Sequence, residues 1–422
     1  MKKTFLFLML LPTMAFAQSG TNSPYSQYGL GLLSDQSTGF NRAMGGVAQG
    51  MHESNQINHQ NPASYSNVDS LTFLFDVGAA LQITNFKEGN RKLNANNSNF
   101  EYVTMSFRVA PRFGMSAGII PISNIGYDYY TTNKVSEGST TSYTTQYNGS
   151  GGTRVMYIGA GWQPIKNFSI GANIGYLWGS YNRNVVNSYT DENANTIGRY
   201  YSAEINSYKF DVGAQYTFKL NSKNNITLGA TYSLGHDLGG SATLQEISNS
   251  LNTSDTITVT HDKAISIPHS YSVGLAWYHT KKIRLGADYT LQQWSTCKFP
   301  DLTNKGYEVT KSAYQDRHKV AFGGEFVNNV NSRRYLDRVH VRAGASYTTP
   351  YLKINGQDGP KEISATIGLG LPISNSWNNR SMLNISAQWA QNNAKGMIRE
   401  NTFRINIGIT FNERWFQKWK VE

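Results

Sequence analysis

The chain has 422 residues and a formal net charge of +11, with only 15 % charged but 13 % aromatic residues. It contains no run of 18 apolar residues, which excludes a helical membrane protein, and its single cysteine, Cys297, excludes an intrachain disulfide and a cysteine metal cluster. The abundance of Gly, Asn, Ser and Tyr is typical of strands that have one apolar and one small, polar face.

The N-terminus has the three parts of a secretory signal peptide. Lys2 and Lys3 precede a short apolar run over 4–14, and Ala15-Phe16-Ala17 fits the small-x-small cleavage rule, so residues 1–17 are predicted to be removed. A buried N-terminal helix is the alternative. Because an exported protein rarely meets nucleic acid, the basic charge favours outer-membrane lipids, lipopolysaccharide or an acidic substrate as partner.

Residues 18–70 lack sustained alternation and are rich in Gly, Asn and Ser. The segment is too long for a simple linker and too polar to face lipid. If the strands that follow close into a wide barrel, a segment of this kind is predicted to fill the lumen as an N-terminal plug, or hatch. A loose tail in the periplasm is the alternative.

From residue 71 onward, apolar residues alternate with polar ones, as in Phe403-Arg404-Ile405-Asn406-Ile407-Gly408. This pattern over 71–422 predicts an all-β fold, a transmembrane antiparallel β-barrel of about 14 strands. The count could be 12 or 16, because 112–164 is hard to divide, and a soluble β-sandwich is the alternative. The predicted strands are 71–86, 97–109, 112–133, 139–164, 168–186, 198–219, 225–240, 256–279, 283–297, 314–328, 338–350, 361–372, 380–392 and 400–411.

The predicted connections alternate in length. Short turns, such as Ala110-Pro111 and 165–167, alternate with long polar links, such as 187–197 and 241–255. Barrels of the Gram-negative outer membrane have short periplasmic turns and long outer loops. We therefore expect both ends of the barrel wall to lie on the periplasmic side of the cell outer membrane.

Charged residues at lumen-facing positions are candidates to hold the plug. They could pair with one another across the lumen or with Arg42, Asp35 or Glu53 of the plug; a solvated lumen wall is the plainer interpretation. These lumen charges are Arg108, Lys209, Asp211, Arg284, Asp288, Glu325 and Arg342.

The end of the plug carries a family-specific pattern. Asn61-Pro62-Ala63 follows a stretch with Gly45-Gly46 and directly precedes the first strand. This arrangement resembles the FadL/TodX family of outer-membrane transporters for long-chain fatty acids and aromatic hydrocarbons. The resemblance implies a 14-stranded barrel, a hydrophobic small-molecule ligand, and a hatch that includes Arg42, Gly45, Gly46, Asn61, Pro62 and Ala63.

Pro121 lies inside the predicted third strand. Proline cannot donate a ladder hydrogen bond, so a bulge or interruption is expected there. In the FadL/TodX family an inward kink of the third strand makes an opening in the wall, and the resemblance implies the same role for Pro121. A proline near the rim without a gating role is the alternative.

No enzymatic site is predicted. His236-Asp237 and His261-Asp262 are adjacent on strands and should point to opposite faces, and no spacing typical of a metal or cofactor site occurs. The sequence is compatible with two functions. One is passive uptake of a hydrophobic small molecule through the hatch and the wall opening. The other, favoured by the polar outer loops, is a non-transporting structural subunit of an outer-membrane secretion or assembly complex, bound to other outer-membrane proteins.

Overall fold

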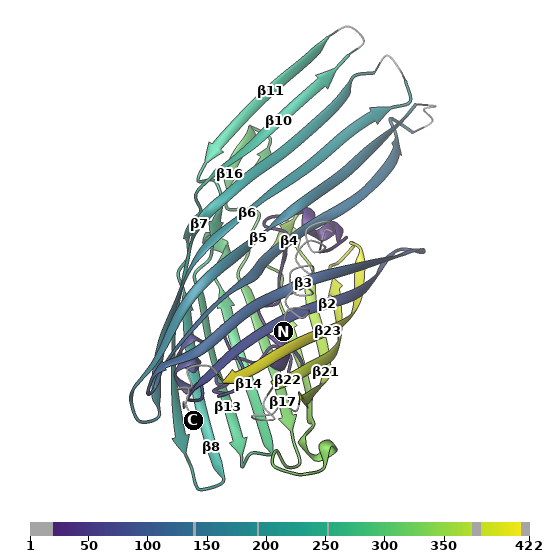
Figure 1. Cartoon of the computed structure of the whole chain (residues 1–422). Helices are drawn as coiled ribbons and strands as arrows, with labels where there is room; N and C mark the ends of the chain where they lie inside the picture. The colour runs from purple at the N-terminus through teal and green to yellow at the C-terminus, as the bar shows by residue number, and fades with distance from the viewer. Residues whose placement is uncertain (1–19, 138–140, 192–193, 251–252, 374–380, 415–422) are drawn as a thin grey trace, which may run out of the picture.

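The computed structural model describes residues 20–137, 141–191, 194–250, 253–373 and 381–414, so the predicted signal peptide lies outside the described residues. Within them, 14 strands form a closed antiparallel barrel (Figure 1). The first wall strand, β2 (Thr72–Glu88), pairs with the last, β23 (Arg399–Arg414), from Thr72↔Arg414 to Lys87↔Arg399. The predicted fold class is confirmed.

The remaining wall strands follow one another around the barrel in chain order. They are β3 (Arg91–Ala110), β4 (Phe113–Lys134), β5 (Ser142–Ile165), β6 (Phe168–Tyr189), β7 (Thr196–Lys219), β8 (Asn224–Ser233), β13 (Ser270–His279), β14 (Ile283–Gln292), β17 (Arg317–Phe326), β18 (His340–Thr348), β21 (Lys361–Ile373) and β22 (Ser381–Asn393).

Short elements lie inside the barrel or in its connections. Inside are η1 (Pro24–Gln27), β1 (Leu32–Leu33), α2 (Gly39–Arg42) and η2 (Pro62–Asn67). In the connections are β9 (His236–Asp237), β10 (Ser241–Asn249), β11 (Ser254–Asp262), β12 (Ser266–Ile267), η3 (Trp294–Thr296), β15 (Phe299–Thr303), β16 (Gly306–Thr310), η4 (Tyr335–Arg338), β19 (Lys353–Ile354) and β20 (Gln357–Asp358). We call the end with the β3–β4 and β5–β6 turns the turn end, and the opposite end the loop end.

The period of two in the sequence separates the two faces of the wall. On β21, Ile363 and Ile367 are exposed on the outside, whereas Ser364 and Thr366 are buried on the lumen side. The same division holds on β23, where Ile405 and Ile407 point outward and Asn406 is buried. An apolar outer belt around a polar interior is the arrangement that lipid requires.

No helix in the described part of the chain is long and apolar enough to cross a membrane.

The strand count was predicted correctly, but several boundaries were not. The segment predicted as one strand over 256–279 is divided among three strands, β11, β12 and β13, and the link predicted over 241–255 contains β10. Figure 1 shows β10, β11 and the upper halves of β4–β7 reaching beyond the rest of the wall. On β11 the residues of both faces are exposed or half-exposed, so alternation is not enforced there and the sequence pattern fades.

The apolar belt can be tested by placing a charge on its outer face. Ile367→Arg, near the middle of β21, should lower the free energy of unfolding in phospholipid vesicles by about 2–4 kcal/mol, because the charge must enter hydrocarbon. Leu93→Arg is the matched control. Leu93 is also exposed but lies among Lys92, Asn94 and Asn96 on the part of β3 nearest the loop end. Equal losses for the two variants would contradict a membrane belt centred on β21.

Candidate functional site: the filled lumen

Residues 20–70, which we call the plug, lie inside the barrel. Every residue from 37 to 51 is buried, although the segment has little regular structure. Helix α2 contacts β22 and β23, η2 contacts β5 and β6, and η1 contacts β4. The plug therefore touches both sides of the lumen, and its polar backbone must find partners on the wall.

Arg42 is the most deeply buried charge of the plug, with 2 % of its side chain exposed. Its guanidinium lies 2.9 Å from the Glu101 carboxylate and donates to Asn406 and to the backbone oxygens of Asp35 and Ser37, each at 3.1 Å. Arg42 fastens the plug to β3 and β23 at once.

Glu101, the partner of Arg42, could not be predicted from the alternation. The β2–β3 register shifts between Gly78 and Ala79, and both Glu101 and Tyr102 are buried as a result. A bulge of this kind re-aims the side chains beyond it. The hydroxyl of Tyr102 accepts a hydrogen bond from the backbone N–H of Gly39, at 2.6 Å, so the bulge supplies two of the plug's anchors.

Gly45 and Gly46 bring the plug backbone against the wall. Their φ angles are +69° and +84°, a conformation that glycine adopts without strain. A Cβ on Gly45 would lie 2.8 Å from the Ala345 carbonyl oxygen, and one on Gly344 would lie 2.2 Å from the Met44 carbonyl carbon. Glycines on both sides therefore permit a backbone-to-backbone contact.

Two wall side chains satisfy the backbone that follows. The Asp288 carboxylate accepts from the N–H groups of Ala48 and Gln49, at 2.6 and 2.9 Å. The Gln215 amide donates to the carbonyls of Gln49 and Met51, at 2.8 and 3.0 Å. Asp288 was among the predicted lumen charges; Gln215 was missed, because an uncharged lumen residue carries no distinguishing signal.

Asn61-Pro62-Ala63 forms the start of η2. The Asn61 side chain accepts from the N–H of Ala63 at 3.2 Å and donates to the Gln49 carbonyl at 2.9 Å, so it caps the helix and ties two parts of the plug together. Pro62 packs against Gly171, where an added Cβ would lie 2.4 Å from the Pro62 carbonyl. The motif thus positions η2 on the wall.

A second charged cluster lies toward the turn end. Glu325 on β17 binds Arg342 at 2.6 Å and also binds Arg284, which lies 3.2 Å from Glu53 of the plug. The structure therefore brings together three of the predicted lumen charges and one of the three plug residues considered as their partners. Glu53 gives the plug an ionic contact with β14.

The three remaining predicted lumen charges, Lys209, Asp211 and Arg108, bond to groups of the wall. Lys209 and Asp211 form an ion pair on β7, with the Ser233 hydroxyl bonded to the same carboxylate. Arg108 is half-buried near the turn end and donates to the carbonyl of Ala110 at 3.2 Å.

The wall strands β3 and β4 pair along only part of their length. Their pairing runs from Ala110↔Phe113 to Val103↔Ile119, after which β3 continues with β2 and β4 continues with β5. The β4–β5 register shifts between Pro121 and Ser123. The predicted irregularity at Pro121 thus coincides with the place where two neighbouring wall strands part.

The plug occupies the edge of β4 that β3 leaves. Leu32 and Leu33 of β1 pair with Asn124 and Ser123. The side chain of Gln36 donates to the Pro121 carbonyl at 2.8 Å, and the Ser26 hydroxyl accepts from the N–H of Gly126 at 3.1 Å. Residues 26–36 therefore satisfy the backbone edge of β4.

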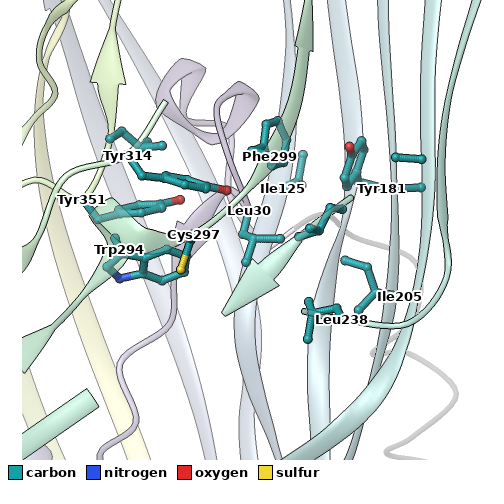
Figure 2. Close-up of a cluster of buried hydrophobic side chains, with 14 of the residues drawn as sticks. Leu30, Ile125, Tyr181, Ile205, Leu238, Trp294, Cys297, Phe299, Tyr314 and Tyr351 are labelled. Carbon is teal, nitrogen blue, oxygen red and sulfur yellow. The ribbon is translucent and has the colours of Figure 1, made fainter. Parts of the chain in front are cut away.

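An aromatic cluster lies in the lumen toward the loop end (Figure 2). Trp294 packs on Tyr351 and Tyr314, with ring centroids 4.8 and 5.3 Å apart, and Leu30 of the plug reaches into the same cluster. The Tyr351 hydroxyl donates to the carbonyl of Gly31. Connections between strands and the plug thus share one apolar core.

A cavity of about 370 Å³ lies between this cluster and the plug residues Gln49, His59 and Gln60. One wall is apolar and includes Ile120, Val155 and Leu177. Polar side chains on its other sides include His59, Gln60 and Lys209. Its volume is within the range that small-molecule sites occupy. No group of three or more His, Cys, Asp or Glu residues in the described ranges could hold a metal ion.

The anchoring role of Arg42 can be tested through the plug's local stability. Arg42→Met leaves Glu101 buried without its cation, which should lower the free energy of local opening by about 3–5 kcal/mol. The measurement is hydrogen exchange of the Ala48 and Gln49 amides, which the wall protects. The double variant Arg42→Met/Glu101→Gln should regain much of the protection. Unchanged exchange in the single variant would show that the pair does not hold the plug.

The closed wall, the apolar belt and the filled lumen define an outer-membrane β-barrel with the FadL/TodX fold. The chain belongs to the BamG family, whose model matches residues 1–422.

Solved structures with this fold include two named toluene transporters. Pseudomonas putida TodX is 17 % identical with a TM-score of 0.61, over 91 % of this chain and 100 % of that chain. Ralstonia pickettii TbuX is 16 % identical with a TM-score of 0.59, over 90 % and 98 %. A Pseudomonas aeruginosa FadL homologue is 12 % identical with a TM-score of 0.59, over 90 % and 99 %. No curated protein matches the chain.

Proposed function

We propose that the protein is an outer-membrane channel for the passive uptake of hydrophobic small molecules, with its turn end and both ends of its wall facing the periplasm. The observation that carries the proposal is the separation of β3 from β4 above Val103↔Ile119, beside a cavity of ligand size. The similar solved structures that are named as toluene transporters support the same function.

In this proposal the plug is a hatch with two parts. Its lower part, around Arg42, Gly45, Gly46 and Asn61-Pro62-Ala63, stays fixed by the buried contacts described above. Its upper part, residues 20–36, fills the space beside β4 at Pro121 through a two-residue strand, side-chain hydrogen bonds and the buried side chains of Tyr25 and Leu30. Residues 32–36 are only half-buried, unlike residues 37–51, so this stretch is the easier one to displace, and ligand would leave through the wall where β3 and β4 part.

A disulfide that fixes the upper plug tests this path. Leu33 and Ser123 are directly opposite, next to a hydrogen bond from the N–H of Ser34 to the Ile122 carbonyl. They are therefore a closely spaced, non-hydrogen-bonded pair suited to a disulfide. In a Cys297→Ser background, oxidised Leu33→Cys/Ser123→Cys should lose most toluene uptake into proteoliposomes, and reduction should restore it.

The matched control fixes the plug away from the gap. The hydroxyls of Ser66 and Ser169 lie 2.9 Å apart, between η2 and β6. Oxidised Ser66→Cys/Ser169→Cys should transport as the reduced form does. Equal uptake by the oxidised and reduced Leu33→Cys/Ser123→Cys variant would rule out release beside β4, and no uptake by the wild-type chain would rule out the channel.

A second candidate function is a structural subunit of an outer-membrane assembly or secretion complex. The observation that favours it is β11, whose only pairing in the described part of the chain is with β10. Ile257 on this strand is 57 % exposed. An exposed edge strand is a site where a strand of another protein can add.

The second candidate predicts a partner whose binding depends on this edge. A tagged chain at native level, extracted in mild detergent, should retain an outer-membrane protein in fixed stoichiometry. Ile257→Lys should release that protein, because a charge on an edge strand opposes strand addition. Leu336→Lys is the control, at an 82 % exposed leucine in η4. A lone monomer from the wild-type chain would contradict this role.

A further inference from the structure

The lumen cavity has a polar end that the contacts within the protein leave incomplete. His59 is 6 % exposed and lines the cavity, yet neither of its ring nitrogens has a hydrogen-bond partner in the part of the chain that the structure describes. The side-chain nitrogen of the adjacent Gln60, which also lines the cavity, is buried without a partner as well. Buried polar atoms are normally hydrogen-bonded, so these nitrogens point to a missing partner.

The position of His59 is fixed even though its ring is unpaired. The Asn173 side chain on β6 donates to the His59 carbonyl at 3.0 Å, and the Tyr65 hydroxyl in turn donates to the Asn173 oxygen at 3.1 Å. The imidazole lies beside the Tyr157 ring, with centroids 5.8 Å apart. The unpaired ring is thus held in place at the cavity wall.

Strand register places an apolar surface directly above this polar end. Ile120, Val155 and Leu177 are partners across β4, β5 and β6, and all three are buried and line the cavity. Gly175 lies two residues nearer the turn end than Leu177. Its partners on the neighbouring strands are Tyr157 and Lys209. Two residues of strand correspond to roughly 7 Å, about the length of one substituted aromatic ring.

The charges around His59 determine which kind of polar group a ligand could place there. Lys209 is already paired with Asp211, and the other basic residues that line the cavity, Arg317, Lys319 and Arg404, lie on β17 and β23. Burial, reinforced by the nearby Lys209, lowers the pKa of His59 to about 4, although Asp211 opposes the shift, and the ring is therefore neutral at pH 7. A neutral imidazole has one donor and one acceptor nitrogen, and Gln60 adds a second donor.

We propose that this is a binding site for a neutral hydroxylated ligand, a phenol or a short alcohol, whose hydroxyl bonds His59 and Gln60 while its apolar body lies on Ile120, Val155 and Leu177. A hydroxyl donates one hydrogen bond and accepts up to two, which matches the free nitrogens. A hydrocarbon would leave them unpaired, and a carboxylate has no proton to donate to the acceptor nitrogen of the imidazole. This inference rests on the proposed function, since it assumes that the lumen takes a small-molecule ligand.

Three compounds with the same ring and methyl group separate these possibilities: toluene, p-cresol and p-toluate. Binding to the mature chain in nanodiscs is measured by calorimetry against empty nanodiscs. The wild-type chain should bind p-cresol about tenfold more tightly than toluene, as two modest hydrogen bonds allow, and p-toluate most weakly. Equal affinities for p-cresol and toluene, or tightest binding of p-toluate, would overturn the hydroxyl site.

Variants of His59 connect the preference to the residue. His59→Phe keeps a ring beside Tyr157 but removes both nitrogens, and should abolish the p-cresol preference while toluene binding is kept. His59→Gln retains a donor and an acceptor and should keep most of the preference. Heat-modifiable migration of the folded barrel on gels confirms that each variant is folded. An unchanged preference in folded His59→Phe would overturn the assignment.

Uptake measured on the same preparations separates this inference from the proposed function. Toluene uptake with no preference for p-cresol would overturn the hydroxyl site alone. Absence of both binding and uptake would overturn the channel together with the site.

Discussion

The constraint on which the whole structure depends is that a β-sheet in lipid must have no free edge. The pairing of β2 with β23 removes the last edge and fixes a wall of 14 strands. A barrel of that width encloses a lumen that its own wall side chains do not fill. The buried plug is therefore a consequence of closure, and its polar backbone in turn dictates which residues the lumen face must carry.

The plug is attached by two kinds of contact, and their distribution divides it into two parts. Near the turn end, backbone lies against backbone at Gly45 and Gly344, and buried charges such as Arg42 and Asp288 meet their partners from several strands. Nearer the loop end, the attachment is the short strand β1 and side-chain bonds to the edge of β4. The half-buried stretch 32–36 lies at the level where the wall strands β3 and β4 part, whereas residues 37–51 are buried throughout.

The separation of β3 from β4 lies beside the two structural features that bear on function, the upper plug and the cavity. The edge of β4 that β3 leaves is satisfied by the plug, so the wall is kept intact there by a segment that is not part of it. The cavity behind this edge has an apolar row and an unpaired imidazole at one end. In the proposed function, a ligand in the cavity and the plug at the gap would contact neighbouring surfaces of β4.

The sequence by itself determined the features that repeat. The alternation in segments such as 403–411 yielded the fold class and the strand count, because every lipid-facing strand obeys the same two-residue period. It also singled out Asp288 and Pro121, since a charge or a proline stands out against that period, whereas Arg42 was named as a charge of the plug, where the period is absent. Only the tertiary structure decided what depends on register: the bulge that turns Glu101 toward Arg42, the use of Gln215 as a backbone partner, and the separation of β11 from β13. The physical reason is that alternation records which face a residue occupies, whereas register and contacts across the lumen record how strands far apart in the chain meet, and no local pattern encodes that.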